Sequence, residues 1–109
     1  LPSSGVPIMQ SCETMYDPAR AQGAVMRLGF AMDEDRMVVS VAEGRIETRR
    51  GEVEVAEVVV RAPPPVVAAA VYGKVPLAAL EGEGAMRIDG DRDVFTRFID
   101  FFHLPEKAG

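Results

Sequence analysis

Alternation of apolar with polar or small side chains is the feature of this sequence that most restricts its fold. Two alternating runs, 26–32 and 37–42, are separated by Asp33-Glu34-Asp35, and a third run, 45–49, follows Glu43-Gly44. Alternation places the apolar side chains of a strand on one face, and short acidic or acid-glycine links are typical of hairpin turns. The three runs are therefore predicted to form an antiparallel meander with one buried face.

The stretch after the meander contains two further strand signals and two short helix signals. Valine-rich residues 57–61 predict a fourth strand, and Pro63-Pro64-Pro65 ends it because proline cannot donate a ladder hydrogen bond. Proline suits the first turn of a helix, and short helices are predicted over 65–72 and 76–82. Alternation returns over 85–89 and predicts a fifth strand.

The last predicted element is an amphipathic helix. Asp91 supplies its N-cap, and Pro105 prevents much continuation beyond His103, so the helix is predicted to end near that histidine. Its apolar residues share one face and hold most of the aromatic side chains of the chain. They are Val94, Phe95, Phe98, Phe101 and Phe102.

The element order places the chain in the α+β class, because four strands come in a block and the helices follow later. We expect a five-stranded, mainly antiparallel sheet covered on one face by short helices and the C-terminal amphipathic helix. The domain is predicted over 17–106, starting at the helix signal Asp17-Pro18. Residues 1–16 are expected to be a linker or the tail of a preceding element, and 107–109 a C-terminal tail. Because the chain begins at Leu1, we expect a fragment or a processed form.

Charge, apolar run length and cysteine content exclude several function classes. The 17 acidic and 12 basic residues give a net charge of −5, whereas nucleic-acid-binding domains usually carry a basic face, so direct contact with nucleic acid is not expected. No apolar run reaches the roughly 18 residues of a membrane span, and no stable membrane insertion is expected. The single cysteine, Cys12, cannot form an intrachain disulfide, which is compatible with the cytoplasm as the expected location.

Three segments occur in an order and spacing typical of one protein family. The most specific is 82–91, Gly-Glu-Gly-Ala-Met-Arg-Ile-Asp-Gly-Asp, which precedes the aromatic helix; the hairpin 41–46 and the helix end 71–73 come before it. With these segments the chain from Asp17 to Glu106 resembles the sterol-carrier-protein superfamily. The resemblance implies an α+β domain that holds a lipid or another apolar small molecule between a sheet and its covering helices, without catalysis.

A narrower resemblance involves both ends of the predicted domain. Residues 16–23 and 102–106 look like those of sterol-carrier-like domains fused behind a winged helix-turn-helix domain in bacterial transcription regulators. This resemblance implies a ligand-sensing domain that reaches DNA only through a missing winged-helix domain. The N-terminus departs from the free carriers because it lacks their long amphipathic first helix, and this departure argues against a membrane-shuttling role.

The candidate ligand-binding residues are the apolar side chains expected to face one another between sheet and helices. Their alternative role is that of an ordinary packed core, although methionine adapts to irregular apolar sites and supports a cavity. A buried ligand also needs polar anchors, for which Ser40, Thr48 and Tyr72 are candidates. The apolar candidates are Leu28, Phe30, Met32, Met37, Val39, Val41, Val58, Val60, Val71, Leu80, Met86, Ile88, Phe95, Phe98 and Phe102.

No catalytic residue, metal site or cofactor site is predicted. His103 lies at a helix end, where its charge would favour the helix dipole, and Cys12 lies in the predicted linker. The acids at 33–35 and 89–93 are turn and cap residues without the ligand pattern of a calcium loop. Residues 81–84 are glycine-rich but acidic, and they lack the lysine of a phosphate loop.

Three functions remain open on the sequence alone. The first is the sensor domain of a transcription regulator, the second a free-standing intracellular lipid carrier, and the third a structural or dimerisation module without ligand, which would make a homodimer. Arg45, Arg49 and Arg50 are predicted to form a basic strand face, either solvated or a contact surface.

Overall fold

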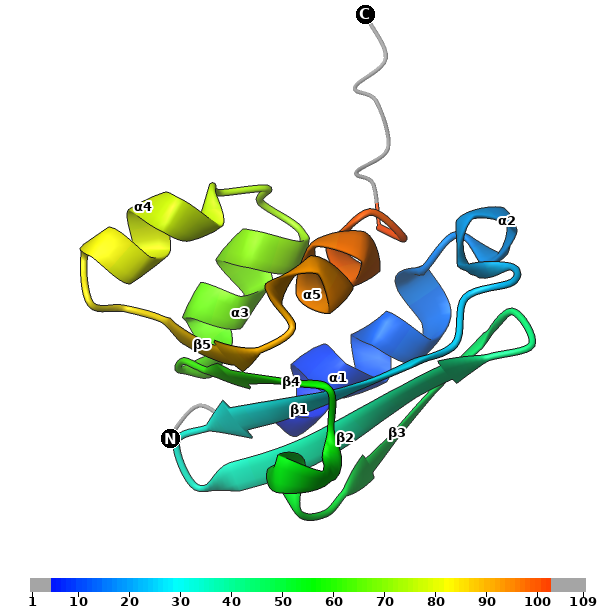
Figure 1. Cartoon of the computed structure of the whole chain (residues 1–109), viewed down its shortest axis with the longest axis horizontal. Helices are drawn as coiled ribbons and strands as arrows, with labels where there is room; N and C mark the ends of the chain where they lie inside the picture. The colour runs from blue at the N-terminus through cyan, green and yellow to red at the C-terminus, as the bar shows by residue number, and fades with distance from the viewer. Residues whose placement is uncertain (1–4, 103–109) are drawn as a thin grey trace, which may run out of the picture.

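A five-stranded sheet in the order β3-β2-β1-β4-β5 forms the centre of the structure, a computed structural model that describes residues 5–102 (Figure 1). β1 pairs in parallel with β4, and the other neighbours are antiparallel. The α+β class and the mainly antiparallel five-stranded sheet are therefore confirmed. The strands are β1 Met26–Met32, β2 Asp35–Ala42, β3 Arg45–Arg50, β4 Val58–Arg61 and β5 Arg87–Gly90.

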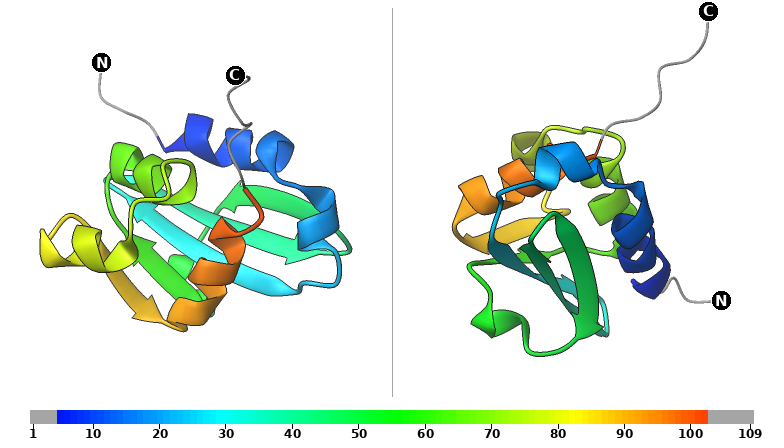
Figure 2. Two further views of the ribbon diagram at one scale, coloured as in Figure 1. Left: turned by 90° about the horizontal axis from the view of Figure 1, so that it is seen from above. Right: turned by 90° about the vertical axis from the view of Figure 1, so that its right-hand side faces the viewer.

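The helices cover one face of the sheet (Figures 1 and 2). Side chains cap two of them: the Asp17 carboxylate accepts from Ala19 N at 2.9 Å, and that of Asp91 accepts from Asp93 N at 3.1 Å. Such caps satisfy amide groups that the first helical turn leaves without a partner. The helices are α1 Val6–Met15, α2 Pro18–Ala21, α3 Pro64–Val71, α4 Leu77–Gly82 and α5 Arg92–Ile99.

The turn between β2 and β3 shows how local sequence sets the sheet register. Glu43 and Gly44 have φ of 54° and 74°, and Ala42 pairs directly with Arg45. Positive φ at both central residues is typical of the two-residue turn whose twist matches that of the adjoining strands. This register directs Met37, Val39 and Val41 toward the helices, as the alternation predicted.

Residues 1–16 are predicted to be a linker or the tail of a preceding element, but within this range Val6–Met15 forms helix α1. Pro7 lies in its first turn, and Met9 and Cys12 are completely buried against the sheet, where α1 contacts β2 and β3. A first helix is therefore present, but it has only ten residues, whereas the prediction concerned the long amphipathic helix of the free carriers. The signal was weak: serine, glycine and proline dominate the start of the segment, and only two buried residues with helical spacing mark its inner side.

Helix α5 is shorter than predicted and ends at Ile99 instead of near residue 103. Phe101 N donates to Phe98 O at 3.0 Å and Phe102 N to Ile99 O at 3.1 Å, so the chain tightens into turns while both phenylalanines stay buried. Lys74 Nζ donates to Ile99 O at 2.7 Å and also to Phe102 O, which satisfies carbonyls at the end of the helix. His103 lies outside the described residues.

A second, small core lies on the sheet face opposite the helices. The 3-10 turn η1, Val53–Val55, places Val53 directly over Gly29, and Val38 and Val59 flank that glycine on the neighbouring strands. All three valines are buried. The outer face is therefore partly covered, whereas the alternation had suggested cover on one face only.

Candidate ligand-binding site

The apolar candidates lie together in one layer between the sheet and the helices, called here the apolar layer. Fourteen of the fifteen predicted residues are buried, and Ile88 is half-buried and packed against them. Met9, Cys12, Met26 and Ile46 join the same layer. The alternation thus identified the inner face of the sheet correctly, while the side chains contributed by α1 were not predicted.

Aromatic rings form the centre of the apolar layer. Phe30 of β1 lies 5.8 Å from Phe95 and 5.9 Å from Phe98 between ring centroids, and Phe98 lies 5.1 Å from Phe102. The first and last of these pairs have the edge-to-face geometry that aromatic rings favour. Sheet and C-terminal helix are therefore joined through direct contacts between aromatic rings.

Methionines surround this aromatic centre. Met32 is fully buried and Met26, Met37 and Met86 nearly so. An unbranched thioether side chain changes shape at low energetic cost and fills irregular space. The apolar layer is thus closed in this structure but is built from side chains that can repack around an inserted molecule.

A polar cluster adjoins the apolar layer between α1 and the end of α3. The Tyr72 hydroxyl and Ser11 Oγ lie 2.7 Å apart and either can donate to the other; Cys12 Sγ lies 3.8 Å from the Tyr72 hydroxyl and Ile8 O lies 2.6 Å from Ser11 Oγ, as alternative acceptors of the two protons. Burial raises the pKa of Cys12 and of Tyr72 to about 12 each, so both groups are neutral at physiological pH. This cluster is a neutral hydrogen-bonding site beside an apolar interior.

Of the three predicted anchors, only Tyr72 lies beside the apolar layer. Ser40 points to the outer face of the sheet, and Thr48 binds Glu13 at the edge of β3. Ser11 is not among the predicted anchors, because its segment carries no strong helix signal. The Tyr72 contact could not be found from sequence, since Ser11 and Tyr72 meet only after α1 and α3 have packed.

Four surface hollows are lined by residues of the described range 5–102, and of the predicted set only Val41 lines one of them. Three lie along β1–β3, and the fourth is formed by Arg20, Arg97, Asp100 and Phe101 beside α5. Phe101 separates this fourth hollow from Phe98, whose ring centroid is 6.1 Å from its own.

Two kinds of reactive centre, a metal site and a nucleophilic thiol, are absent from the described residues. Within 5–102 no three His, Cys, Asp or Glu side chains are grouped so that they could hold a metal ion. The Cys12 thiol is buried, and its raised pKa of about 12 keeps it protonated, which removes its nucleophilic form. In the same part of the chain no helix combines the length and the apolar character needed to cross a membrane.

Neither a protein-family profile nor a curated protein matches the sequence. Solved structures do match. A stereoselective inverting sec-alkylsulfatase from Pseudomonas sp. is 18% identical with a TM-score of 0.84, and the match covers 95% of this chain but only 17% of that one. The UbiJ-SCP2 ubiquinone synthesis protein is 17% identical over 89% of this chain and 90% of its own, with a TM-score of 0.70.

A palmitated sterol carrier protein 2-like protein from Aedes aegypti is 14% identical over 88% of both chains, with a TM-score of 0.57. Together these likenesses show that the chain has the fold of sterol carrier protein 2 domains. They also show that this fold occurs within a much longer chain, since the present sequence spans about a sixth of the sulfatase.

Proposed function

We propose that this domain binds an apolar ligand of the lipid class in the apolar layer, without catalysing a reaction. The observation that carries the proposal is the composition of this layer: phenylalanine and methionine side chains lie between sheet and helices, and the hydroxyls of Tyr72 and Ser11 lie beside them. Lipid pockets need this combination of an adaptable apolar lining and few polar anchors. The fold shared with a palmitated sterol carrier protein 2-like protein supports it.

The ligand's polar group is assigned to the Tyr72–Ser11 pair. Because both hydroxyls can donate and accept, they suit a carboxylic acid, an ester or an alcohol. The ligand's chain would then extend from the α1–α3 side toward Phe98 and Met86. Entry requires α1 and α3 to separate, which breaks the 2.7 Å contact between the two hydroxyls and replaces it by a contact with the ligand.

The expected affinity is modest. Burying about 300 Å² of alkyl surface contributes about 7–8 kcal/mol, from which association subtracts about 4 kcal/mol or more. Separating the helices to open the closed apolar layer reduces the binding free energy further. At most about 3–4 kcal/mol remains, so we expect a dissociation constant in the millimolar range.

A more specific proposal concerns the kind of protein in which this domain works. Residues 16–23 and 102–106 resemble those of regulators with a winged helix, which supports a cytoplasmic sensor domain that alters DNA binding when it takes up ligand. A second candidate is a domain that holds apolar substrate inside a longer enzyme, and the match to one sixth of an alkylsulfatase favours it. A free-standing carrier is the third. The coding sequence around this domain discriminates among them.

The experiment combines native mass spectrometry of protein purified from cells with a dodecanoate titration. We expect co-purified lipid and saturable binding, weakened about three- to tenfold by Tyr72→Phe, the effect of one hydrogen bond. Tyr16→Phe is the matched control, because the Tyr16 hydroxyl donates to Gly44 O at 2.9 Å in the β2–β3 turn. Empty protein together with no dodecanoate binding up to millimolar concentration would disprove the proposal.

A further inference from the structure

Three hollows that share Ser40 adjoin one another across the outer face of β1, β2 and β3, and the largest of them also extends around the β3 edge to Glu13, Ile46 and Thr48. Their volumes are about 660, 280 and 120 Å³, and all three are lined by Ser40. Small side chains form the floor and long charged ones the walls. Together the hollows are called here the outer trough, defined by Arg27, Ser40, Ala42, Arg45, Glu47 and Arg49.

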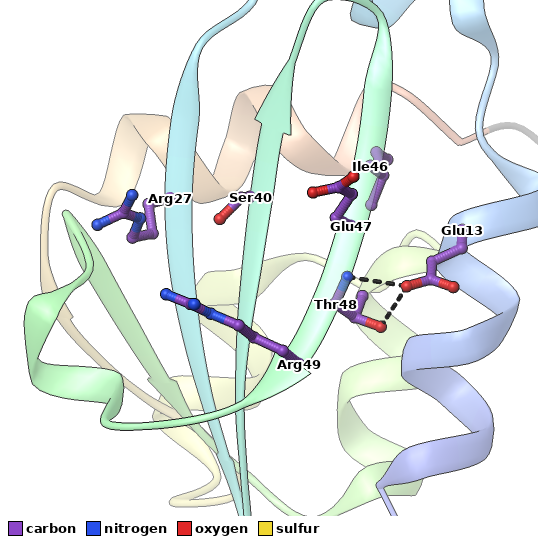
Figure 3. A pocket seen from close by; sticks show the side chains of 7 residues that line it. All are labelled: Glu13, Arg27, Ser40, Ile46, Glu47, Thr48 and Arg49. Carbon is purple, nitrogen blue, oxygen red and sulfur yellow. Dashed lines mark hydrogen bonds between the residues drawn. The ribbon is translucent and has the colours of Figure 1, made fainter.

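The walls of the outer trough hold arginines without ion-pair partners. Six of the ten arginines in residues 5–102 form ion pairs, as Arg36 does with Glu54 at 3.5 Å and Arg61 with Asp89 at 3.1 Å. No carboxylate among the described residues pairs with Arg27, Arg45 or Arg49. Figure 3 shows Arg27, Ser40 and Glu47 on one side of the sheet, with the Arg49 side chain extending over β2.

Arg45, Arg49 and Arg50 are predicted to form one basic strand face, and this prediction is wrong for Arg50. Arg45 and Arg49 alternate onto the outer face, whereas Arg50 has the opposite direction and pairs with Asp35 at 2.9 Å. Arg27 of β1 takes its place in the trough. Strand periodicity explains the difference, because residues 49 and 50 cannot face the same side.

Exposed valines adjoin these guanidinium groups at the β1 end of the outer trough. Val25 is 77% and Val55 55% exposed, and both line the hollow that Arg27 also lines. Arginine beside exposed apolar side chains around a concave surface is typical of protein interfaces.

We propose that the outer trough is a docking surface for an extended segment of a partner protein that presents carboxylates alternating with apolar side chains. Carboxylates would pair with Arg27, Arg45 and Arg49, bidentate where the geometry allows, and apolar side chains would cover Val25 and Val55. The trough spans about 10 Å from β1 to β3, the distance across three strands. A strand or loop fits this width.

The charges that line the outer trough favour such a protein segment over a membrane or a nucleic acid. Glu43 and Glu47 line the trough between the arginines, Glu13 and Glu57 line its two ends, and the whole chain carries a net charge of −5. Uniformly anionic membranes or nucleic acids would be repelled by both, and a flat membrane would not reach the floor at Ser40. A segment with spaced carboxylates avoids these glutamates.

Strand addition at the edge of β3 is disfavoured, so we expect the partner segment to bind on the outer face of the sheet. The Glu13 carboxylate accepts from Thr48 N at 2.8 Å and from Thr48 Oγ1 at 2.6 Å. This occupies an edge amide that strand addition would need.

The test is a titration of the ¹⁵N-labelled domain with a short synthetic peptide of alternating glutamate and valine. We expect amide shifts centred on Ser40 and Ala42 and an affinity reduced at least about tenfold by the double change Arg27→Gln and Arg49→Gln. The matched control, Arg36→Gln with Arg61→Gln, changes two ion-paired arginines and should leave the affinity unchanged. Circular dichroism checks that each variant is folded.

Other outcomes of the same experiment would overturn the inference. These are absence of shifts at millimolar peptide, equal binding of a lysine–valine peptide, or shifts confined to the helical side. Binding of phosphatidylcholine vesicles with phosphatidylglycerol that requires Arg27 and Arg49 would instead assign the trough to a membrane and would also contradict it. Ligand binding in the apolar layer is tested separately, by the dodecanoate titration.

Discussion

Gly29 is a position of β1 where a side chain on the outer face of the sheet has no room. A Cβ at this position would lie 2.7 Å from both Val53 Cβ and Val53 O. The backbone of β1 and the 3-10 turn η1 can approach this closely only where no side chain intervenes. Gly29 therefore decides how η1 covers the outer face.

Gly29→Ala should lower the free energy of unfolding by about 1–3 kcal/mol, because the new methyl group overpacks a buried contact. Urea denaturation followed by circular dichroism measures the change. Gly82→Ala is the control: no atom lies within 4 Å of its added Cβ, and stability should stay the same or rise slightly. Equal stability of Gly29→Ala and the wild type would show that η1 does not rest on β1.

The buried thiol of Cys12 predicts a loss of stability at alkaline pH. Burial raises its pKa from 9.0 to about 12, so the unfolded chain releases this proton at lower pH than the folded chain. The stability that the neutral thiol contributes is complete below pH 9 and is lost as the pH rises toward about 12. Urea midpoints between pH 7 and pH 11 measure the slope, and Cys12→Ala should make it shallower. An unchanged slope in that variant would contradict the assignment.

At the scale of elements, α1 is attached to the sheet by two side chains at its C-terminal end. Glu13 binds the edge of β3 at Thr48, and the Tyr16 hydroxyl donates to Gly44 O in the β2–β3 turn. Together with Met9 and Cys12, these contacts make a segment rich in polar residues into a structural part of the domain.

Glu13→Ala should free the Thr48 amide and weaken the attachment of α1. We expect a loss of about 1 kcal/mol of stability together with faster hydrogen exchange at Thr48. Glu34→Ala, an exposed glutamate in the β1–β2 turn, serves as the comparison and should change neither quantity. Slow exchange at Thr48 in the Glu13 variant would mean that another group protects this edge.

Local patterns predicted the strands and the later helices, because alternation and proline or glycine signals lie within each element. Features that depend on contacts between distant segments were missed. The burial of α1 requires the inner face of β2 and β3, and the position of η1 requires Gly29. Likewise, the apolar residues of the site were predicted, whereas the Ser11–Tyr72 contact depends on how α1 and α3 pack.

At the scale of the whole molecule, the sheet separates two surfaces of different chemistry. Its inner face carries the apolar layer, closed by the helices, and its outer face carries the trough, whose arginines form no ion pair within residues 5–102. Ligand uptake and partner docking would thus use opposite faces of the same strands. Because β1 and β2 contribute residues to both surfaces, a shift of these strands around a bound ligand would also move residues of the outer trough.

Methionine methyl NMR tests ligand binding in the apolar layer most directly. Met26, Met32, Met37 and Met86 lie in that layer, whereas Met15 is 55% exposed on α1 and serves as an internal control. When the ¹³C-methyl-labelled protein is titrated with dodecanoate, the buried methionine signals should shift and saturate while that of Met15 stays constant. Shifts confined to Met15, or none up to millimolar dodecanoate, would contradict ligand binding between the sheet and its helices.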